Sequence, residues 1–141
     1  VELDLAQQKP CISRGGTDIT IVGTSHASLL AREAAIRVSS ENISAEVIDV
    51  RVLNPFFVDD IVESVKKTRN LLVVDSGTLS GGFSGEIIAK VIERLPVDCL
   101  KAPPLRIALP DAPAPTSRLL EKKYYTSYDD VVSAVRKILQ R

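Results

Sequence analysis

The chain has 141 residues, of which 45% are hydrophobic and 26% are charged, and its formal net charge at pH 7 is zero. A chain of this size and composition is expected to fold as one globular domain with a sizeable core. The balanced charge excludes the basic surface of a nucleic-acid-binding protein, and the apolar runs are too short to span a membrane.

The rarest residue types limit the chemistry of the chain. Cys11 and Cys99 lack the close spacing of a metal-binding or redox pair. We expect two free thiols in a reducing compartment, with a disulfide between them as the alternative. His26 is the single histidine, so a histidine-based metal site or catalytic triad would have to centre on it. Methionine is absent, even at the first position, which predicts a piece of a longer protein.

In chain order, the pattern of apolar residues predicts strands and helices in alternation. Residues 1–16 show no periodicity and are expected to form a lead-in or linker, which leaves 17–141 as the domain. Segments with apolar centres are the predicted strands: 18–23, 44–53, 70–75 and 105–109. Amphipathic segments are the predicted helices: 25–40, 59–68, 82–95 and 126–139. Such an order predicts a mainly parallel sheet covered on both faces, a three-layer α/β/α fold.

Residues at the predicted helix ends support these boundaries. Ser25 and Ser127 each stand at the start of a predicted helix and are expected to cap it through their hydroxyl groups. Glu86 and Lys90 are four residues apart and are expected to pair on the outer face of the third helix.

The stretch VVDSGTLSGGFSGEII, residues 73–88, combines a strand end, four glycines and a helix start. The glycines are Gly77, Gly81, Gly82 and Gly85. Their spacing lacks both the lysine of a Walker loop and the glycine pattern of a dinucleotide-binding turn. A helix start beside such a turn can still bind an anion through free N–H groups. The residue chemistry favours the alternative, a tight turn that permits close approach of another backbone or subunit.

Three further groups of residues are candidates for a site. Ser25 and His26 are a nucleophile and a base by type, but adjacent residues at a helix start point in different directions, so capping is the better account of Ser25. Asp49 and Asp75 lie near strand ends, where α/β sheets bind ligands, and a metal or ribose pair and a pair of turn formers are equally open. Packing or a subunit surface explains the third, aromatic group more simply than nucleobase stacking does: Tyr124, Tyr125 and Tyr128.

A resemblance to a known family rests on five strings in a fixed order: GTDITIVG, AEVIDVRVLNPF, VKKTRNLLVVDSGTLSGGFSGEI, LRIALPDAPAP and YDDVVSAVRKIL. Over about residues 14–141 the chain resembles the C-terminal domain of the transketolase superfamily. Within that superfamily it is most similar to the β subunit of the thiamine-diphosphate-dependent E1 component of 2-oxo acid dehydrogenases. Pyruvate, branched-chain 2-oxo acid and acetoin dehydrogenases share this layout.

The resemblance implies that the chain is the non-catalytic C-terminal domain of a longer enzyme. In the family, the catalytic histidine and the pyrimidine-side glutamate belong to a preceding domain, and the α subunit binds the diphosphate and Mg²⁺. No catalytic, cofactor-binding or metal-binding residue of the family therefore falls on this chain, which is expected to be inactive alone. Relatives often have a glutamate where Ser76 stands, so a charged contact at that position is not carried over.

The same resemblance implies partners: the E1 α subunit, a second β subunit and the docking domain of the acyltransferase (E2), but no nucleic acid and no membrane. A loop that contacts a neighbouring subunit is expected at Gly77, Gly81, Gly82, Phe83 and Gly85. Acidic groups late in the chain are expected to dock the acyltransferase domain: Asp111, Asp129, Asp130 and the terminal carboxylate of Arg141. The alternative is that Asp111 shapes a turn and that Asp129 and Asp130 favour a helix start.

Two other functions remain open at this point. The first is the C-terminal domain of another transketolase-like enzyme, such as a deoxyxylulose-phosphate-synthase-like protein. The second is a free-standing α/β module that binds a partner or a small anion. No secretory signal opens the chain, so the expected location is the cytoplasm or, in a eukaryote, the mitochondrial matrix.

Overall fold

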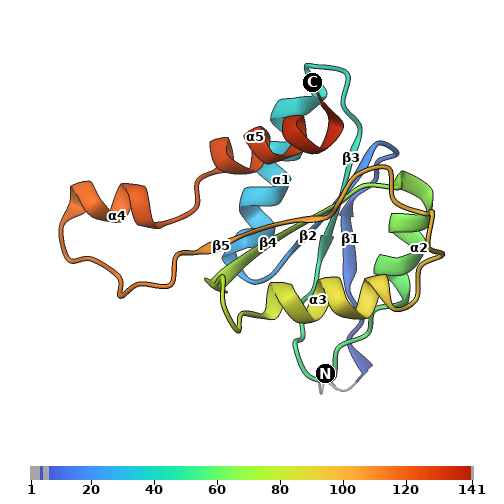
Figure 1. Cartoon of the computed structure of the whole chain (residues 1–141), viewed down its shortest axis with the longest axis horizontal. Coiled ribbons are helices and arrows are strands. Elements are labelled where there is room, and N and C mark those ends of the chain that lie inside the picture. Colours follow the sequence, from blue (N-terminus) through green and yellow to red (C-terminus); the bar gives the residue numbers. More distant parts are fainter. Residues whose placement is uncertain (1–3, 5–6, 141) are drawn as a thin grey trace.

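A computed structural model describes Asp4 and residues 7–140 of the chain. Its strands are β1 (Cys11–Arg14), β2 (Ile19–Gly23), β3 (Ala45–Asp49), β4 (Leu71–Thr78) and β5 (Leu105–Leu109). Its helices are α1 (His26–Ser39), α2 (Asp59–Thr68), α3 (Phe83–Ile92), α4 (Arg118–Tyr124) and α5 (Tyr128–Leu139). Figure 1 shows the strands between layers of helices, with α4 set apart at one end of the molecule.

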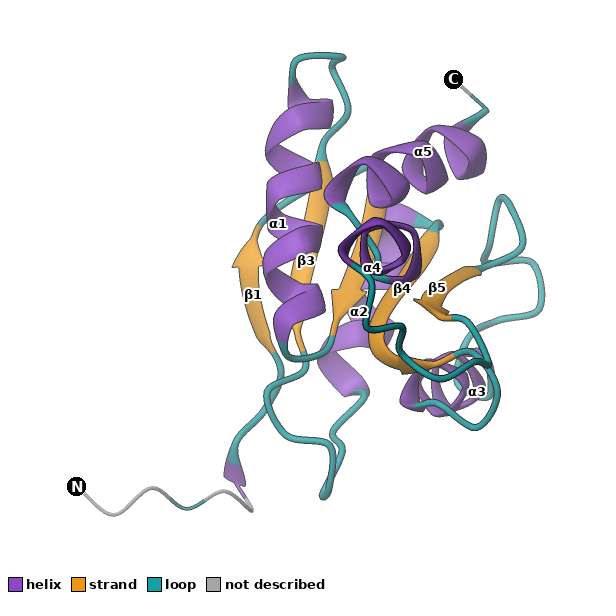
Figure 2. Cartoon of the chain, turned by 90° about the vertical axis from the view of Figure 1, so that its left-hand side faces the viewer, coloured by secondary structure: helices purple, strands orange, loops and turns teal. Residues whose placement is uncertain are grey.

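Within the described residues, the strands form one sheet in the order β1-β3-β2-β4-β5. β2 pairs in parallel with β3 and β4, β4 pairs in parallel with β5, and β1 runs antiparallel to β3. Helices α1 and α5 cover one face of the sheet, and α2 and α3 cover the other (Figures 1 and 2). The expected three-layer α/β/α fold with a mainly parallel sheet is therefore confirmed.

The core forms because the central strands are apolar on both faces and the helices are apolar along one stripe. Strand β2 is buried throughout, and so is β4 from Leu71 to Asp75. One apolar cluster joins α1 and α5 to the sheet, and a second joins α2 and α3 to its other face. Burial contributes about 25 cal/mol for each Å² of apolar surface, so these clusters hold the three layers together.

Strand β1 corrects the expectation that residues 1–16 have little structure of their own. Cys11–Arg14 pairs with β3 along the edge of the sheet. Three of its four residues are exposed, so the strand lacks the apolar alternation by which strands are recognised. After β1, Gly16 lies against the backbone of β3, where an added Cβ would sit 2.2 Å from the Ala45 carbonyl carbon. Residues 1–3 and 5–6 of the expected lead-in lie outside the described residues.

The helix starts give different outcomes for the two expected serine caps. The Ser127 hydroxyl accepts a hydrogen bond from the Asp130 N–H over 3.3 Å, and the Asp130 carboxylate accepts one from the Ser127 N–H over 2.8 Å, so this cap is confirmed. The Ser25 cap is wrong, because the side chain makes no capping bond. The Ser25 backbone has φ 51° and ψ −130°, which is far from the extended geometry of a cap.

Several segments also differ from the sequence pattern, among them the strand expected over 44–53, which ends at Asp49. The pattern assigns no element to residues 118–124, where the structure has α4. Strand β4 continues to Thr78, and α3 ends at Ile92. The expected pair between Glu86 and Lys90 is confirmed on α3, with 3.2 Å between carboxylate oxygen and ammonium nitrogen.

A buried carboxylate joins β3 to α2 and to the turn before β2. Glu46 is 2% exposed, and its Oε2 accepts hydrogen bonds from the Lys67 ammonium over 2.5 Å and from the Gly16 N–H over 3.1 Å. Burial raises the pKa of Glu46, but hydrogen bonds, of which that from Lys67 is the largest, outweigh burial and hold the pKa below its usual 4.5. The ionised form therefore stabilises the fold above pH 4.5, and this contribution is lost as the pH falls through the folded-state pKa.

We expect Glu46→Gln to lower the free energy of unfolding at neutral pH, with a deficit that shrinks on acidification. The amide cannot pair ionically with Lys67, whereas the wild-type carboxylate loses the same interaction once it is protonated. Urea-induced unfolding of both proteins from neutral pH to below pH 4.5 measures the deficit. Glu63→Gln is the matched control, because Glu63 pairs with Lys66 on the exposed side of α2, where such pairs contribute about 0–1 kcal/mol. A deficit for Glu46→Gln that stays equal at every pH would contradict this role.

Candidate functional site at the carboxyl edge of the sheet

The carboxyl ends of β2, β3 and β4 meet at one edge of the sheet, which is where α/β folds bind ligands. The order β3-β2-β4 makes this edge a switch point, because the chain leaves β2 toward β3 and then crosses to β4 on the other side. Two neighbouring cavities of about 570 and 290 Å³ open there. Asp75 and Ser76 line both cavities, so we take this edge as the candidate site.

Asp75 ends the buried part of β4 and is itself 5% exposed. Its Oδ1 accepts hydrogen bonds from the Thr24 hydroxyl over 2.8 Å and from the Gly77 N–H over 3.0 Å. Its Oδ2 accepts one from the Ser84 N–H over 2.8 Å. Because Thr24 follows β2 and Ser84 lies in the first turn of α3, one carboxylate ties the end of β2 to the start of α3. Asp75 was open to two roles, a metal or ribose ligand and a turn former. The geometry supports the turn former, which also anchors α3 to β2.

This geometry answers the question that the glycine-rich loop raises. Free N–H groups at a helix start attract an anion, and in α3 the Ser84 N–H is directed at the Asp75 carboxylate. The Gly85 N–H donates to the Gly82 carbonyl oxygen over 3.2 Å. The loop therefore binds a carboxylate of its own chain in the position that a phosphate cradle offers to a ligand.

The glycines of the loop have different reasons to be small. A Cβ added at Gly82 would sit 2.0 Å from the Thr78 carbonyl oxygen, so close backbone approach occurs here within the chain itself. Gly81 has φ +70°, a backbone angle that residues other than glycine rarely adopt. Gly77 and Gly85 have room for a Cβ, with the nearest atoms at 3.5 and 3.4 Å. The expected contact of this loop with a neighbouring subunit remains a prediction.

The structure separates Ser25 from His26. Ser25 lines the larger cavity and His26 lines the smaller one. Asp49 also lines the larger cavity, but its carboxylate accepts from the Arg51 N–H over 3.2 Å and so shapes the turn after β3. Asp4 and residues 7–140 include no group of three or more His, Cys, Asp or Glu side chains that could hold a metal ion. The left-handed turn at Arg51, with φ 65°, has no sequence signal.

Of the acidic groups expected to dock a partner, those of Asp111, Asp129 and Asp130 lie in the described structure. The terminal carboxylate of Arg141 lies outside it. The Asp111 carboxylate accepts from the Ser80 hydroxyl over 2.6 Å and from the Ser80 N–H over 2.9 Å, and these hydrogen bonds lower the pKa of Asp111. Asp130 completes the cap of α5, and Asp129 is exposed in the same turn. The alternative roles at a turn and a helix start account for Asp111 and Asp130, and docking remains a prediction.

The tyrosines before and at the start of α5 make packing contacts. The Tyr124 hydroxyl donates to the Ala112 carbonyl oxygen over 2.8 Å, and the Tyr124 and Tyr125 rings meet edge-on at 5.1 Å. The Arg37 guanidinium lies 5.2 Å from the centre of the Tyr128 ring. These contacts agree with packing as the simpler explanation, and the bond to Ala112 closes the proline-rich bend that residues 110–117 predict.

The remaining observations concern an aromatic contact at this edge, the two cysteines and the length of the helices. Phe83 lines the larger cavity and meets Phe56 edge-on, with ring centres 5.1 Å apart. Cys11 and Cys99 are both free thiols, as expected. Among the helices that the structure describes, none combines the length and the apolar character needed to cross a bilayer.

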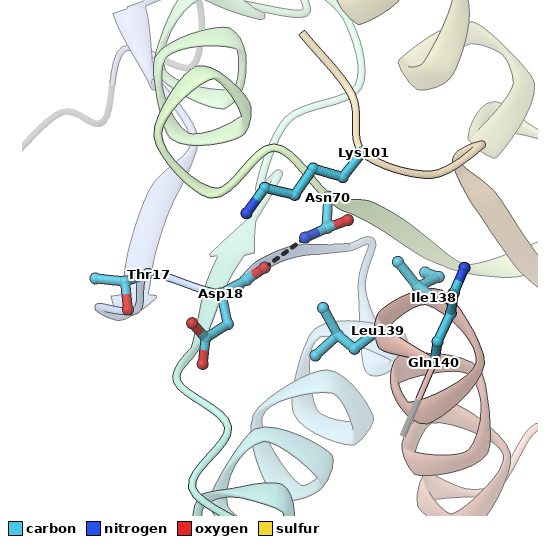
Figure 3. A pocket seen from close by; sticks show the side chains of 7 residues that line it. All are labelled: Thr17, Asp18, Asn70, Lys101, Ile138, Leu139 and Gln140. Carbon is cyan, nitrogen blue, oxygen red and sulfur yellow. Dashed lines mark hydrogen bonds between the residues drawn. The ribbon is translucent and has the colours of Figure 1, made fainter.

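A cavity of about 330 Å³ lies at the opposite, amino edge of the sheet (Figure 3). Asp18, Asn70 and Lys101 line one side, and the end of α5 lines the other. The Asn70 amide donates to the Asp18 carbonyl oxygen over 2.8 Å and to the Thr68 carbonyl oxygen over 3.3 Å, so this side chain joins strand ends. Because open α/β sheets bind ligands at the other edge, we do not take this cavity as the site.

The chain belongs to the family described as transketolase, C-terminal domain, which it matches over residues 9–131. It is 38% identical over 133 residues to the mitochondrial pyruvate dehydrogenase E1 component subunit β of Dictyostelium discoideum, and the match covers 94% of this chain and 37% of that protein. The corresponding subunits of Rickettsia bellii and Caenorhabditis elegans are 38% and 39% identical over 92% and 93% of this chain. The chain spans 37–40% of the length of these three relatives.

Solved structures agree with this family. The chain superposes on a split gene transketolase, described as an inactive β4 tetramer, with a TM-score of 0.80 and 28% identity, over 99% of this chain and 44% of that one. It shares the fold alone with a 2-oxoglutarate:ferredoxin oxidoreductase from Magnetococcus marinus, with a TM-score of 0.60 and 14% identity. The resemblance carried by the five sequence strings is therefore confirmed.

Proposed function

We propose that the chain is the non-catalytic assembly and partner-docking domain of a thiamine-diphosphate-dependent 2-oxo acid dehydrogenase, within the β subunit of its E1 component. The observation that carries the proposal is the match of nearly the whole chain to pyruvate dehydrogenase E1 β subunits. The parent enzyme would decarboxylate oxidatively a 2-oxo acid such as pyruvate or a branched-chain 2-oxo acid, or would cleave acetoin. The names of these relatives favour pyruvate.

Thiamine diphosphate and Mg²⁺ belong, in this proposal, to other parts of the parent enzyme. The residues of this domain do not fit them. The Ser84 N–H at the start of α3, which would face a diphosphate, donates to the buried Asp75 carboxylate. No side-chain cluster of the described residues suits a metal ion. In this proposal the domain supports the enzyme through contacts between subunits.

The partners in this proposal are the E1 α subunit, a second β subunit and the docking domain of the acyltransferase. The structural relative described as a β4 tetramer supports association between copies of the chain. Exposed Asp129 and the Asp111 carboxylate are the candidate contacts for the acyltransferase domain. The location follows the parent enzyme, in the cytoplasm or in the mitochondrial matrix.

A second candidate is the C-terminal domain of a transketolase. The split gene transketolase favours it, because the chain superposes on that protein over 99% of its own length. Both candidates make this chain a domain of a larger enzyme, and they differ in the substrate of that enzyme. The β subunit of a 2-oxo acid dehydrogenase is preferred because the relatives at 38–39% identity carry that name.

We expect the chain to associate with copies of itself and to show no binding of thiamine diphosphate in the presence of Mg²⁺. Association is measured by sedimentation velocity over a concentration series, and cofactor binding by calorimetric titration. A clear low-micromolar isotherm would overturn the non-catalytic role. A chain that stays monomeric at every concentration, and that also fails to bind a full-length E1 β subunit, would overturn the assembly role.

A further inference from the structure

Helix α4 stands away from the three layers, as Figure 1 shows. None of its residues is buried. Leu119 and Leu120 are 77% and 55% exposed, and Tyr125 directly after the helix is 50% exposed. A helix of a globular protein ordinarily turns its apolar residues toward a core, so these exposed leucines lack a core to pack against among the described residues.

The segment that carries α4, residues 110–127, is nevertheless held in place; we call it the arm. At its start, the Asp111 carboxylate accepts two hydrogen bonds from Ser80. Within the arm, the Tyr124 hydroxyl donates to the Ala112 carbonyl oxygen over 2.8 Å, so the end of α4 is joined to the start of the arm. Ordering a segment costs conformational entropy, and burial within the chain does not offset this cost for α4. The arm is thus an ordered segment whose apolar side chains stay exposed.

The base of the arm lies beside the smaller cavity of the carboxyl edge. Ala27 and Leu30 of α1, Leu109 at the end of β5 and Tyr125 form its apolar wall. Its volume is about 290 Å³. A dry cavity of about 150 Å³ accommodates benzene, so this one has room for a leucine side chain. The same edge also exposes Leu29, at 60%.

We propose that the arm and this cavity form a self-complementary interface with a second copy of the chain. In this interface, Leu119 and Leu120 of each copy enter the cavity of the other. In a two-fold contact both partners use the same surface. That surface must therefore carry both a protruding part and a cavity that accepts it. The inference rests on the proposed function, because it names the surface through which that function would join two copies.

Charge also favours a second copy as the partner. Helix α4 carries Arg118, Lys122 and Lys123 against the single acid Glu121. None of these three cations forms an ion pair with another described residue. The first turn of α5, which follows the arm, carries the acids Asp129 and Asp130. A two-fold contact can therefore bring the cations of one copy to the carboxylates of the other, whereas the cations of α4 would repel a basic partner.

The first test changes the two leucines. We expect the double variant Leu119→Asp/Leu120→Asp to dissociate into monomers, with the dimer dissociation constant raised about tenfold or more in sedimentation velocity. At concentrations low enough for wild type to be monomeric, its melting temperature should match that of wild type, because neither side chain is buried. The matched control is Ile92→Asp/Val97→Asp, which places two acids on exposed apolar positions of α3 and the loop after it. This control should leave the dimer intact.

The second test exchanges charges between copies. Lys122→Glu/Lys123→Glu and Asp129→Lys should each weaken the homodimer, whereas mixing the two variants should restore association, because the changed charges then face each other. Asp129 lies outside the capping box, so its substitution leaves the start of α5 in place. Restoration is read from the heterodimer fraction in native mass spectrometry.

The outcomes separate this inference from the proposed function. If wild type dimerises and the leucine variant dimerises equally well, the arm is not the interface, while assembly by the domain stands. If the charge variants show no restoration on mixing, the two-fold arrangement is wrong. If wild type does not associate at all, self-assembly itself fails, and the inference fails with it.

Discussion

Replacing Asp75 by alanine is expected to lower the free energy of unfolding by about 3 kcal/mol or more. The carboxylate accepts hydrogen bonds from the Thr24 hydroxyl, the Gly77 N–H and the Ser84 N–H. Each buried donor left without an acceptor costs about 1–3 kcal/mol, and alanine removes the acceptor for all three. The loss also frees the start of α3 from the end of β2, so the carboxyl edge should loosen before the rest of the fold.

The measurement is urea-induced unfolding, with amide hydrogen exchange at the start of α3 as a local readout. Asp75→Asn supplies a graded variant, because its side chain keeps the shape but has one acceptor oxygen in place of two. Asp49→Ala is the matched control, since Asp49 also ends a strand but accepts one hydrogen bond, from the Arg51 N–H. Equal, small losses for Asp75→Ala and Asp49→Ala would show that Asp75 is no anchor.

The second large effect is expected at Gly82, where alanine should cost about 1–3 kcal/mol of unfolding free energy. The added methyl group would lie 2.0 Å from the Thr78 carbonyl oxygen, which belongs to the backbone and cannot rotate away. The Gly82 backbone has φ −73°, so alanine meets no torsional penalty there and the effect isolates the clash.

Gly77→Ala is the control for this loop. A Cβ at Gly77 would lie 3.5 Å from the Asp75 carboxylate, an ordinary contact, so its stability should stay near that of wild type. Thermal unfolding compares the two variants. A normal melting temperature for Gly82→Ala together with weakened self-association would move the close approach from within the chain to the subunit contact that the family resemblance implies.

The layers of the fold could be predicted from the sequence because their physical cause is local. Runs of apolar residues with β-branched centres, such as Ile19–Gly23, have few ways to be buried other than as central strands. Strand β1 could not be predicted in this way, because it forms at an exposed edge where side-chain burial leaves no pattern. Helix α4 could not be predicted for a related reason, because its leucines are exposed and leave no pattern of buried residues.

The contacts that build the candidate site could not be predicted from the sequence. Ser25 and Ser127 look alike in the sequence, yet Ser127 caps a helix whereas Ser25 has φ 51° and ψ −130° and makes no capping bond, a difference that depends on how the chain leaves the preceding segment. The need for a small residue at Gly82 is visible in the sequence, but its partner, Thr78, is not. The role of Asp75 depends on Thr24, which is 51 residues away and reaches it through the pairing of β2 with β4.

The order of the strands has a consequence for synthesis of the chain. Strand β2 emerges early, but it is completed on one side by β3 and on the other by β4, and the face that α1 covers is closed by α5, the last helix. Arg136 on α5 reaches back 95 residues to Glu41, just after α1, with which it forms hydrogen bonds of 2.5 and 3.1 Å. A nascent chain that stops before Tyr128 therefore leaves apolar residues of the sheet and of α1 open to chaperones and proteases. Removal of residues 128–140 is therefore expected to expose the apolar face of α1 and the sheet, whereas β2, β3 and β4 keep their partners within the sheet.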